Sequence, residues 1–303
     1  MSIHQHPLAY LLGLEGLALM RAFAGDHDRD FTQARIAEVR ALLDRADDFG
    51  DGVDLEPMPS AEGYDVWAPA YDSPDNPFFA MDESVLLPIL DTLPPGDAID
   101  AMCGTGRYAG HLAARGHRVR GFDSSPGMLD LARTKLPDVE FDLADVAAMP
   151  VPDACADVVV NALAINHVDD LGPAFAEAVR VLRPGGHLLL CSMVGYFPGS
   201  RLSPLLEHNS KGEIGYIREW NHSTGEILRA ALGAGFTVRD CQELVAERSS
   251  DEYDGELELP APGEPMSIWQ LHPWVPTAAS AVRNDRVCLV GWHFELPRPP
   301  ATQ

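Results

Sequence analysis

The stretch that decides the fold is Ala98-Ile-Asp-Ala-Met-Cys-Gly-Thr-Gly106, a short apolar run that reaches an acid and then breaks into a glycine-rich turn. A buried strand ordinarily continues with apolar or β-branched residues, so Asp100 followed by Gly104 and Gly106 predicts a strand that stops at a ligand. The glycines let the backbone approach that ligand closely, and the next helix offers its N-terminal amides. We therefore expect the rest of the chain to be arranged around this turn.

From Ala98 onward, the chain alternates short β-like runs with helical patterns, which predicts parallel strands joined by crossover helices. The clearest strand contains Val158-Val159-Val160, the continuous apolar run that a strand covered on both faces requires. We predict an α/β fold: a Rossmann-like, doubly wound, mostly parallel seven-stranded sheet with helices on both faces. The expected strands are 98–102, 118–122, 139–143, 156–162, 187–193, 236–245 and 286–296, and the expected helices are 107–115, one capped by Ser125, 171–182 and 223–232.

A helical segment precedes this fold. Its two expected helices are Leu8–Ala24 and Asp30–Asp47, and the first is apolar nearly all round. Such a helix must be buried against the main domain or against another subunit, so a homo-oligomer through these helices is expected. The acidic, breaker-rich stretch 47–60 is interpreted as a linker. The expected division is an extension with linker at 1–56 and a main domain at 57–303.

Composition restricts the partners. The formal charge of −24 repels nucleic acid phosphates and anionic lipid headgroups, so we expect neither nucleic acid nor a membrane as partner. The first apolar stretch lacks a basic flank and carries Glu15, which argues against a signal peptide or a membrane span. Five widely spaced cysteines without a Cys-x-x-Cys pair suggest no disulfide framework and no metal site, and a reducing cytoplasm fits best.

Two cofactor chemistries compete for the glycine turn. Gly104-x-Gly106-x-x-Ala109 matches the dinucleotide fingerprint, and Asp123 lies where its ribose-binding acid is expected. The alternative is S-adenosylmethionine, with Asp100 helping to hold the cationic amino-acid end, Asp123 the ribose and Asp145 the adenine amino group. The glycines alone satisfy both.

The sequence resembles the class I S-adenosylmethionine-dependent methyltransferases, in particular small-molecule enzymes similar to the ubiquinone-biosynthesis methyltransferases. The resemblance covers about residues 63–245, and several motifs in the right order are far more specific than one. Its motifs are Tyr64-Asp-Val-Trp-Ala-Pro-Ala-Tyr71-Asp72, Asp100-Ala-Met-Cys-Gly-Thr-Gly106, Val119-Arg-Gly-Phe-Asp123-Ser-Ser125, Ala144-Asp145-Val-Ala-Ala-Met-Pro150, Asp157-Val-Val-Val-Asn-Ala-Leu-Ala-Ile-Asn-His-Val168 and Leu182-Arg-Pro-Gly-Gly-His-Leu-Leu189.

The resemblance implies S-adenosyl-L-methionine as cofactor and transfer of its methyl group to an O, N or C nucleophile of a small molecule, as in secondary metabolism. It implies His167 as the base where the acceptor carries a proton. The family usually has Gly at the position of Met102, where a Met side chain either points harmlessly into the sheet or crowds the site. The implied cofactor contacts are Tyr71, Asp100, Met102, Cys103, Gly104, Gly106, Asp123, Ser124, Met128, Asp145, Val146, Asn161 and Ala162.

Three segments are expected to cover the site: a lid at 63–72 and insertions at 194–222 and 249–275. In the lid we expect Tyr71 to face the cofactor, while Tyr64 and Trp67 are either lid or aromatic core. The alternatives to methyl transfer are a nicotinamide-dependent oxidoreductase and a methyltransferase-like protein that binds the cofactor without methylating. The aromatic side chains of the insertions favour an aromatic or extended apolar acceptor; they are Tyr196, Phe197, Tyr216, Trp220, Trp269 and Trp274.

Overall fold

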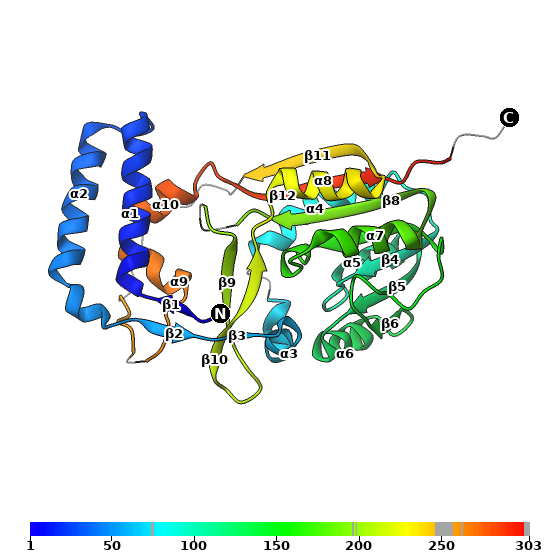
Figure 1. The fold of residues 1–303 in the computed structure, drawn as a ribbon, viewed down its shortest axis with the longest axis horizontal. Coiled ribbons are helices and arrows are strands. Elements are labelled where there is room, and N and C mark those ends of the chain that lie inside the picture. The colour runs from blue at the N-terminus through cyan, green and yellow to red at the C-terminus, as the bar shows by residue number, and fades with distance from the viewer. Residues whose placement is uncertain (74–75, 196, 198, 246–256, 262, 300–303) are drawn as a thin grey trace. The chain divides into compact units, whose positions relative to one another are not determined.

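The computed structural model describes residues 1–73, 76–195, 197, 199–245, 257–261 and 263–299 (Figure 1). The chain forms two compact units, which are described separately. Unit 1 comprises Met1–Pro57, Gly212–Tyr216 and Val245–Arg286, and unit 2 comprises Met58–Lys211, Ile217–Leu244 and Val287–Gln303. The division expected at residue 57 therefore follows only one of several boundaries, because part of the C-terminal half packs with the N-terminal helices.

Unit 2 contains the expected seven-stranded sheet, with the strand order β11-β12-β8-β7-β4-β5-β6 (Figure 1). The pairs β4–β5, β5–β6, β4–β7 and β7–β8 are parallel, and β12 runs antiparallel to β8. The α/β fold with a mostly parallel sheet is confirmed. The strands are β4 (Asp97–Ala101), β5 (Arg118–Asp123), β6 (Glu140–Leu143), β7 (Ala156–Ala162), β8 (Leu182–Met193), β11 (Thr237–Val245) and β12 (Val287–Glu295).

Helices cover both faces of this sheet. One face packs against α4 (Pro77–Leu90), α5 (Arg107–Ala114) and α6 (Pro126–Lys135). The other face packs against α7 (Leu171–Val181) and α8 (Thr224–Ala234). The Val158-Val159-Val160 run of β7 is buried between the two layers, as its composition requires.

Local sequence signals explain several helix starts. The Ser125 side chain accepts from the Met128 amide and caps α6, as expected. Ser223 and Glu226 form a capping box at the start of α8. The sequence analysis missed α4, although Asn76 caps it and Pro77 occupies its first turn.

One strand boundary differs from the expectation. A strand was expected over 187–193, after a helix over 171–182, whereas β8 already begins at Leu182 and includes Arg183-Pro-Gly-Gly186. Leu182 pairs with Ala156, the Gly185 amide donates to the Leu296 carbonyl at 2.7 Å, and the register then shifts. Backbone pairing on both sides therefore extends the strand through a sequence that signals a turn.

Several smaller elements lie outside the seven-stranded sheet. The segment 194–222 carries two strands, β9 (Leu202–His208) and β10 (Ile214–Trp220), and a three-stranded sheet has the order β3-β10-β9. The expected linker 47–60 is more structured than its composition suggests, because it holds η1 (Ala46–Phe49) in part, β2 (Val53–Leu55) and β3 (Pro57–Met58). Two further elements are α3 (Ser60–Tyr71) and η2 (Ile165–His167).

Unit 1 has its own core, formed by α1 (Pro7–Ala24) with α2 (Arg29–Asp44) and α10 (Pro276–Arg283). The expected helical pair is confirmed. A buried ion pair at 2.9 Å joins Glu15 of α1 to Arg35 of α2. The remaining elements are β1 (Ile3–Gln5), which pairs with β2, α9 (Ile268–Leu271) and η3 (His272–Trp274).

The helix α1 is the one described helix with the length and composition of a membrane span. Its Leu11, Leu14 and Ala18 side chains are buried inside unit 1, whereas Met20 and Phe23 near its end are exposed. The core helix of a globular protein is buried in the same way. The sequence had led us to expect that this apolar helix is buried.

Candidate active site

The turn between β4 and α5 is held in an unusual backbone conformation. Met102, Gly104 and Gly106 have φ values of 60°, 52° and 83°, in the left-handed region that glycine adopts freely. A Cβ atom on Gly106 would also lie 3.1 Å from the Phe141 ring, so packing as well as φ calls for glycine there. A side chain at Met102 costs roughly 1 to 2 kcal/mol in this conformation, which would favour the glycine that the resemblance implies at this position.

Asp100 lies at the end of β4, beneath the turn. Its side chain is 3% exposed, and its Oδ2 accepts from the Ala109 amide of α5 at 2.7 Å. Burial raises the pKa of Asp100 to about 7, because the ionised carboxylate has lost its water. A buried carboxylate in this condition is stabilised by a cationic ligand.

Asp123 lies at the end of the neighbouring strand β5. Its two carboxylate oxygens accept from the Gly104 amide at 2.8 Å and from the Ser125 amide at 2.9 Å. These bonds tie the glycine turn to the start of α6. Burial raises the pKa of Asp123 from its ordinary value, although the backbone amides oppose this effect.

A cavity opens where β4, β5 and β7 end at their carboxyl edge, the place where doubly wound sheets bind ligands. It brings together most of the residues predicted from the sequence. The predicted residues that line it are Tyr71, Asp100, Met102, Cys103, Gly104, Asp123, Ser124, Met128, Ala162 and His167, and the further lining residues are Ser60, Tyr64, Thr105, Arg107, Tyr108, Leu163 and Ala164.

Four predicted residues do not line the cavity. Asp145 is exposed, and its Oδ1 accepts from the Ala147 amide at 2.8 Å, while Val146 packs against the core. Asn161 is buried and donates from Nδ2 to the Ala101 carbonyl at 3.0 Å, which joins β7 to β4 behind the turn. Gly106 begins α5 and contributes through the backbone of the turn. The roles of these four residues toward a ligand stay predictions.

An aromatic cluster on α3 forms one wall. The rings of Tyr64, Trp67 and Tyr71 lie 5.1 to 5.9 Å apart between centroids, and Tyr64 and Tyr71 line the cavity. Tyr64 was left undecided between lid and core. Its spacing of seven residues from Tyr71, two helical turns, places both on one face of α3 and could have assigned it.

Two carboxylates fasten α3 to the sheet domain. The Asp65 carboxylate accepts from Ser125 Oγ at 2.6 Å and from the Gly127 amide at 2.7 Å. The Asp72 carboxylate, just after the helix, accepts from Thr105 Oγ1 at 2.6 Å and pairs with the Lys135 ammonium at 2.8 Å. The segment expected as a lid is therefore a helix that is held at its middle by Asp65 and at its C-terminal end by Asp72.

His167 in η2 contacts this wall. Tyr64 Oη lies 2.8 Å from His167 Nε2, and His167 Nδ1 lies 3.1 Å from the Arg218 carbonyl oxygen. Burial lowers the pKa of the imidazole, so the ring is neutral near pH 7. The same desolvation raises the pKa of Tyr64 well above its usual range.

The charge of the cavity lining favours a cation. Asp100 and Asp123 carry the acidic character, and Arg107 is the one Lys or Arg among the described lining residues. Its guanidinium already pairs with Asp82 at 2.6 Å and Glu83 at 2.9 Å. A pyrophosphate would therefore meet acids without a free cation, whereas the ammonium and sulfonium of S-adenosylmethionine fit the donor set.

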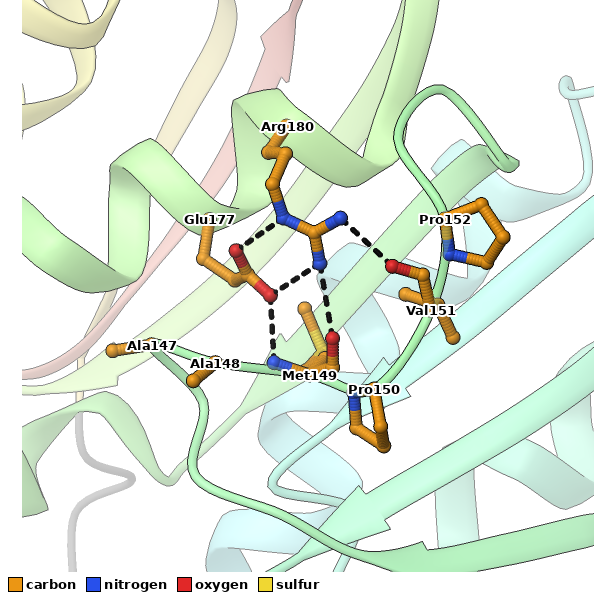
Figure 2. A pocket seen from close by; sticks show the side chains of 8 residues that line it. All are labelled: Ala147, Ala148, Met149, Pro150, Val151, Pro152, Glu177 and Arg180. Atoms are coloured by element: carbon orange, nitrogen blue, oxygen red, sulfur yellow. Dashed lines mark hydrogen bonds and ion pairs between the residues drawn. The ribbon is translucent and has the colours of Figure 1, made fainter.

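A second, shallow hollow lies beside the loop that follows Asp145 (Figure 2). Its polar groups satisfy one another. Arg180 donates to the Met149 and Val151 carbonyls at 3.0 and 2.8 Å, and Glu177 accepts from Arg180 at 2.7 Å and from the Met149 amide at 2.6 Å (Figure 2). We interpret this hollow as a structural support for the loop.

The sequence matches known methyltransferases. A family model described as "Methyltransferase domain" matches residues 99–190. The chain is 40% identical over 100 residues to a malonyl-[acyl-carrier protein] O-methyltransferase of Serratia marcescens, covering 33% of this chain and 39% of that protein. It is 31% identical over 193 residues to the enzyme of that name from Dechloromonas aromatica, covering 60% and 67%. The chain spans about a third to a half of the first curated relatives.

Solved structures share the fold. The [4+2]-cyclase SpnF superposes with a TM-score of 0.54 and 18% identity, covering 81% of this chain and 99% of that one. A SAM-dependent methyltransferase of Methanosarcina mazei gives 0.50 and 15%, covering 70% and 98%. These identities support the fold alone. From the sequence relatives, the chain belongs to the class I S-adenosylmethionine-dependent methyltransferase family, whose cofactor is S-adenosyl-L-methionine.

Proposed function

We propose that this protein transfers the methyl group of S-adenosylmethionine to an oxygen, nitrogen or carbon nucleophile of a small molecule. The observation that carries the proposal is the acid-lined cavity at the carboxyl edge of the sheet, where the one guanidinium among the described lining residues is already paired with carboxylates. An acidic lining suits the sulfonium and ammonium groups of S-adenosylmethionine and disfavours a dinucleotide pyrophosphate.

The chain's own residues would bind, orient and exclude water. Asp100 would hold the cationic amino-acid end, Asp123 would accept hydrogen bonds from the ribose, and Tyr71 would cover the ligand. The bound cofactor supplies a methyl group that its sulfonium already activates. The protein then contributes mainly alignment in a dry site, which is worth up to roughly 7 to 11 kcal/mol in well-oriented reactions.

Several finer features belong to the same proposal. The aromatic α3 wall supports an aromatic or extended apolar acceptor, of the kind that secondary metabolism supplies. Exposed Phe23 and Met20 on α1 support self-association through the N-terminal helices. The net charge of −24 and the free cysteines are consistent with a cytoplasmic protein without nucleic acid or membrane partners.

Of the other expected acceptor-covering aromatics, Tyr216 and Trp274 are buried in unit 1, and Trp269 is exposed there. Tyr196 and residues 246–256 lie outside the described residues. The expectation that 194–222 and 249–275 cover the acceptor therefore stays a prediction, with α3 as its best supported part.

Methyl-labelled S-adenosylmethionine incubated with the protein and the dialysable fraction of a bacterial extract tests the proposal. We expect label in small molecules with the wild-type protein, unchanged transfer with the exposed control Asp130→Asn, and loss of transfer and cofactor affinity in Asp123→Ala. Tight binding of the donor without any transfer would instead indicate a methyltransferase-like protein of another activity, and binding of NAD would indicate an oxidoreductase.

A further inference from the structure

The side chains of Tyr64 and His167 form a hydrogen-bonded pair in the wall of the cavity. Both residues line the cavity, and both imidazole nitrogens are engaged, Nε2 with Tyr64 Oη at 2.8 Å and Nδ1 with the Arg218 carbonyl at 3.1 Å. A substrate in the cavity therefore meets no free ring nitrogen. The oxygen of Tyr64, in contrast, keeps a lone pair that can accept from a bound molecule.

The partners of His167 determine its tautomer. A carbonyl oxygen can only accept, so Nδ1 carries the proton and donates to Arg218. The lone pair of Nε2 then accepts from the Tyr64 hydroxyl. The pair thus has a direction: a proton that arrives at Tyr64 Oη can be passed on to Nε2, because the hydroxyl proton already points there.

The surroundings of the pair favour transfer of a proton from Tyr64 to His167 over formation of a tyrosinate at Tyr64. Desolvation is the largest cause that raises the pKa of Tyr64, and Tyr71, Glu219 and Asp123 raise it further. Burial raises the pKa of Glu219, next to Arg218 on β10, to about 7. His167 is neutral because burial lowers its pKa, and the Arg218 carbonyl partly offsets this effect. A lone phenolate is therefore costly here. Burial also disfavours the imidazolium, so the neutral Nε2 takes the proton of Tyr64 only as the acceptor loses its own.

We propose that Tyr64 is the catalytic residue that takes the acceptor's proton, with His167 as the positioning residue that receives the proton of Tyr64. The inference rests on the methyl transfer proposed above. As the acceptor oxygen forms its bond to the methyl carbon, the carbon–sulfur bond breaks with its electron pair left on sulfur. The acceptor proton moves to Tyr64 Oη, the hydroxyl proton of Tyr64 moves to His167 Nε2, and the imidazolium later loses a proton to water.

This device specifies a class of acceptor. A carboxylate, such as that of a malonyl thioester, is ionised at neutral pH and needs no base. An ammonium would bring a second positive charge beside the sulfonium and has more than one proton to lose. A neutral hydroxyl with a pKa near 10, as in a phenol, needs one proton removed and suits the aromatic wall of α3. The geometry therefore points to a phenolic hydroxyl acceptor.

The transfer assay described above tests this with a chemical readout of the product. Label in an aryl methyl ether resists mild alkali and is released as methyl iodide by hot hydriodic acid, whereas a methyl ester releases methanol in alkali. We expect ether label. In Tyr64→Phe and His167→Ala the rate at pH 7 should fall about 100-fold or more, with unchanged donor affinity by calorimetry. Val66→Ala, an exposed change on α3, is the matched control and should keep the wild-type rate.

The pH profile separates chemistry from structure. At saturating donor, the wild-type rate should be flat from pH 8 to 9, where Asp100 and Glu219 are ionised and His167 is neutral. The variant rates should rise about tenfold per pH unit, because the acceptor must then ionise by itself. A purely structural defect lowers the rate equally at every pH.

A second readout needs no substrate. In protein carrying ¹⁵N-labelled histidine, the free wild type should show His167 protonated at Nδ1 and unprotonated at Nε2. Tyr64→Phe should move the Nε2 resonance. A proton on Nε2 at pH 7.5, ester label, or a Tyr64→Phe profile parallel to the wild type would overturn the relay. No transfer to any product by the wild type would instead overturn the proposed function.

Discussion

The substitution Asp100→Asn should make the free protein more stable and weaken cofactor binding, because it removes a carboxylate charge that the free protein buries. Folding raises the pKa of Asp100 from 3.8 to about 7. The contribution of this group to the free energy of unfolding is therefore fully present below pH 3.8 and is lost as the pH rises through 7. At 1.36 kcal/mol per pH unit, the loss is about 1.6 kcal/mol at pH 5 and about 4 kcal/mol at pH 8. Asn has the same shape and can still accept from the Ala109 amide.

The free energy of unfolding of Asp100→Asn, measured relative to that of the wild type, should therefore increase by about 2 to 3 kcal/mol between pH 5 and pH 8. Thermal unfolding of the free proteins measures it, with an expected change of roughly 4 to 12 °C in the difference of their midpoints. The exposed Asp130→Asn is the control and should show no such widening. A gap that is constant with pH, or that narrows, would refute a buried, uncompensated Asp100.

The remaining predictions concern the lid and the sheet. Asp65→Ala removes the carboxylate that accepts the hydrogen bonds of Ser125 and Gly127 and thereby loosens α3. It should weaken S-adenosylmethionine binding about tenfold, the scale of one lost charge-assisted hydrogen bond. A wild-type affinity by calorimetry would contradict the role of Asp65 in holding α3. Gly121→Ala places a Cβ atom 2.4 Å from the Phe141 ring and should lower the free energy of unfolding by about 1 to 3 kcal/mol; an unchanged denaturation midpoint would contradict that packing.

The sheet could be predicted because its signals are local. The run of valines in β7 marks a strand buried on both faces, and the observed limits Ala156–Ala162 match the expected ones. Ser125 before Pro126 likewise marks the start of α6. The glycine turn and the acids Asp100 and Asp123 could be placed at one edge for the same reason, since parallel strands end together.

What could not be predicted depends on contacts between distant residues. The bond between Tyr64 and His167 joins positions 103 residues apart, so no periodicity reveals it. The neutralisation of Arg107 by Asp82 depends on α4, which the sequence analysis did not identify. That Val245–Arg286 packs with the N-terminal helices is equally invisible to local patterns.

A calorimetric titration of the purified protein with S-adenosylmethionine, and separately with NAD, tests the central claim most directly. The acid-lined cavity requires one S-adenosylmethionine bound per chain, release of a proton from Asp100 at pH 7 that Asp100→Asn abolishes, and no heat from NAD. Binding of NAD without binding of S-adenosylmethionine would contradict it.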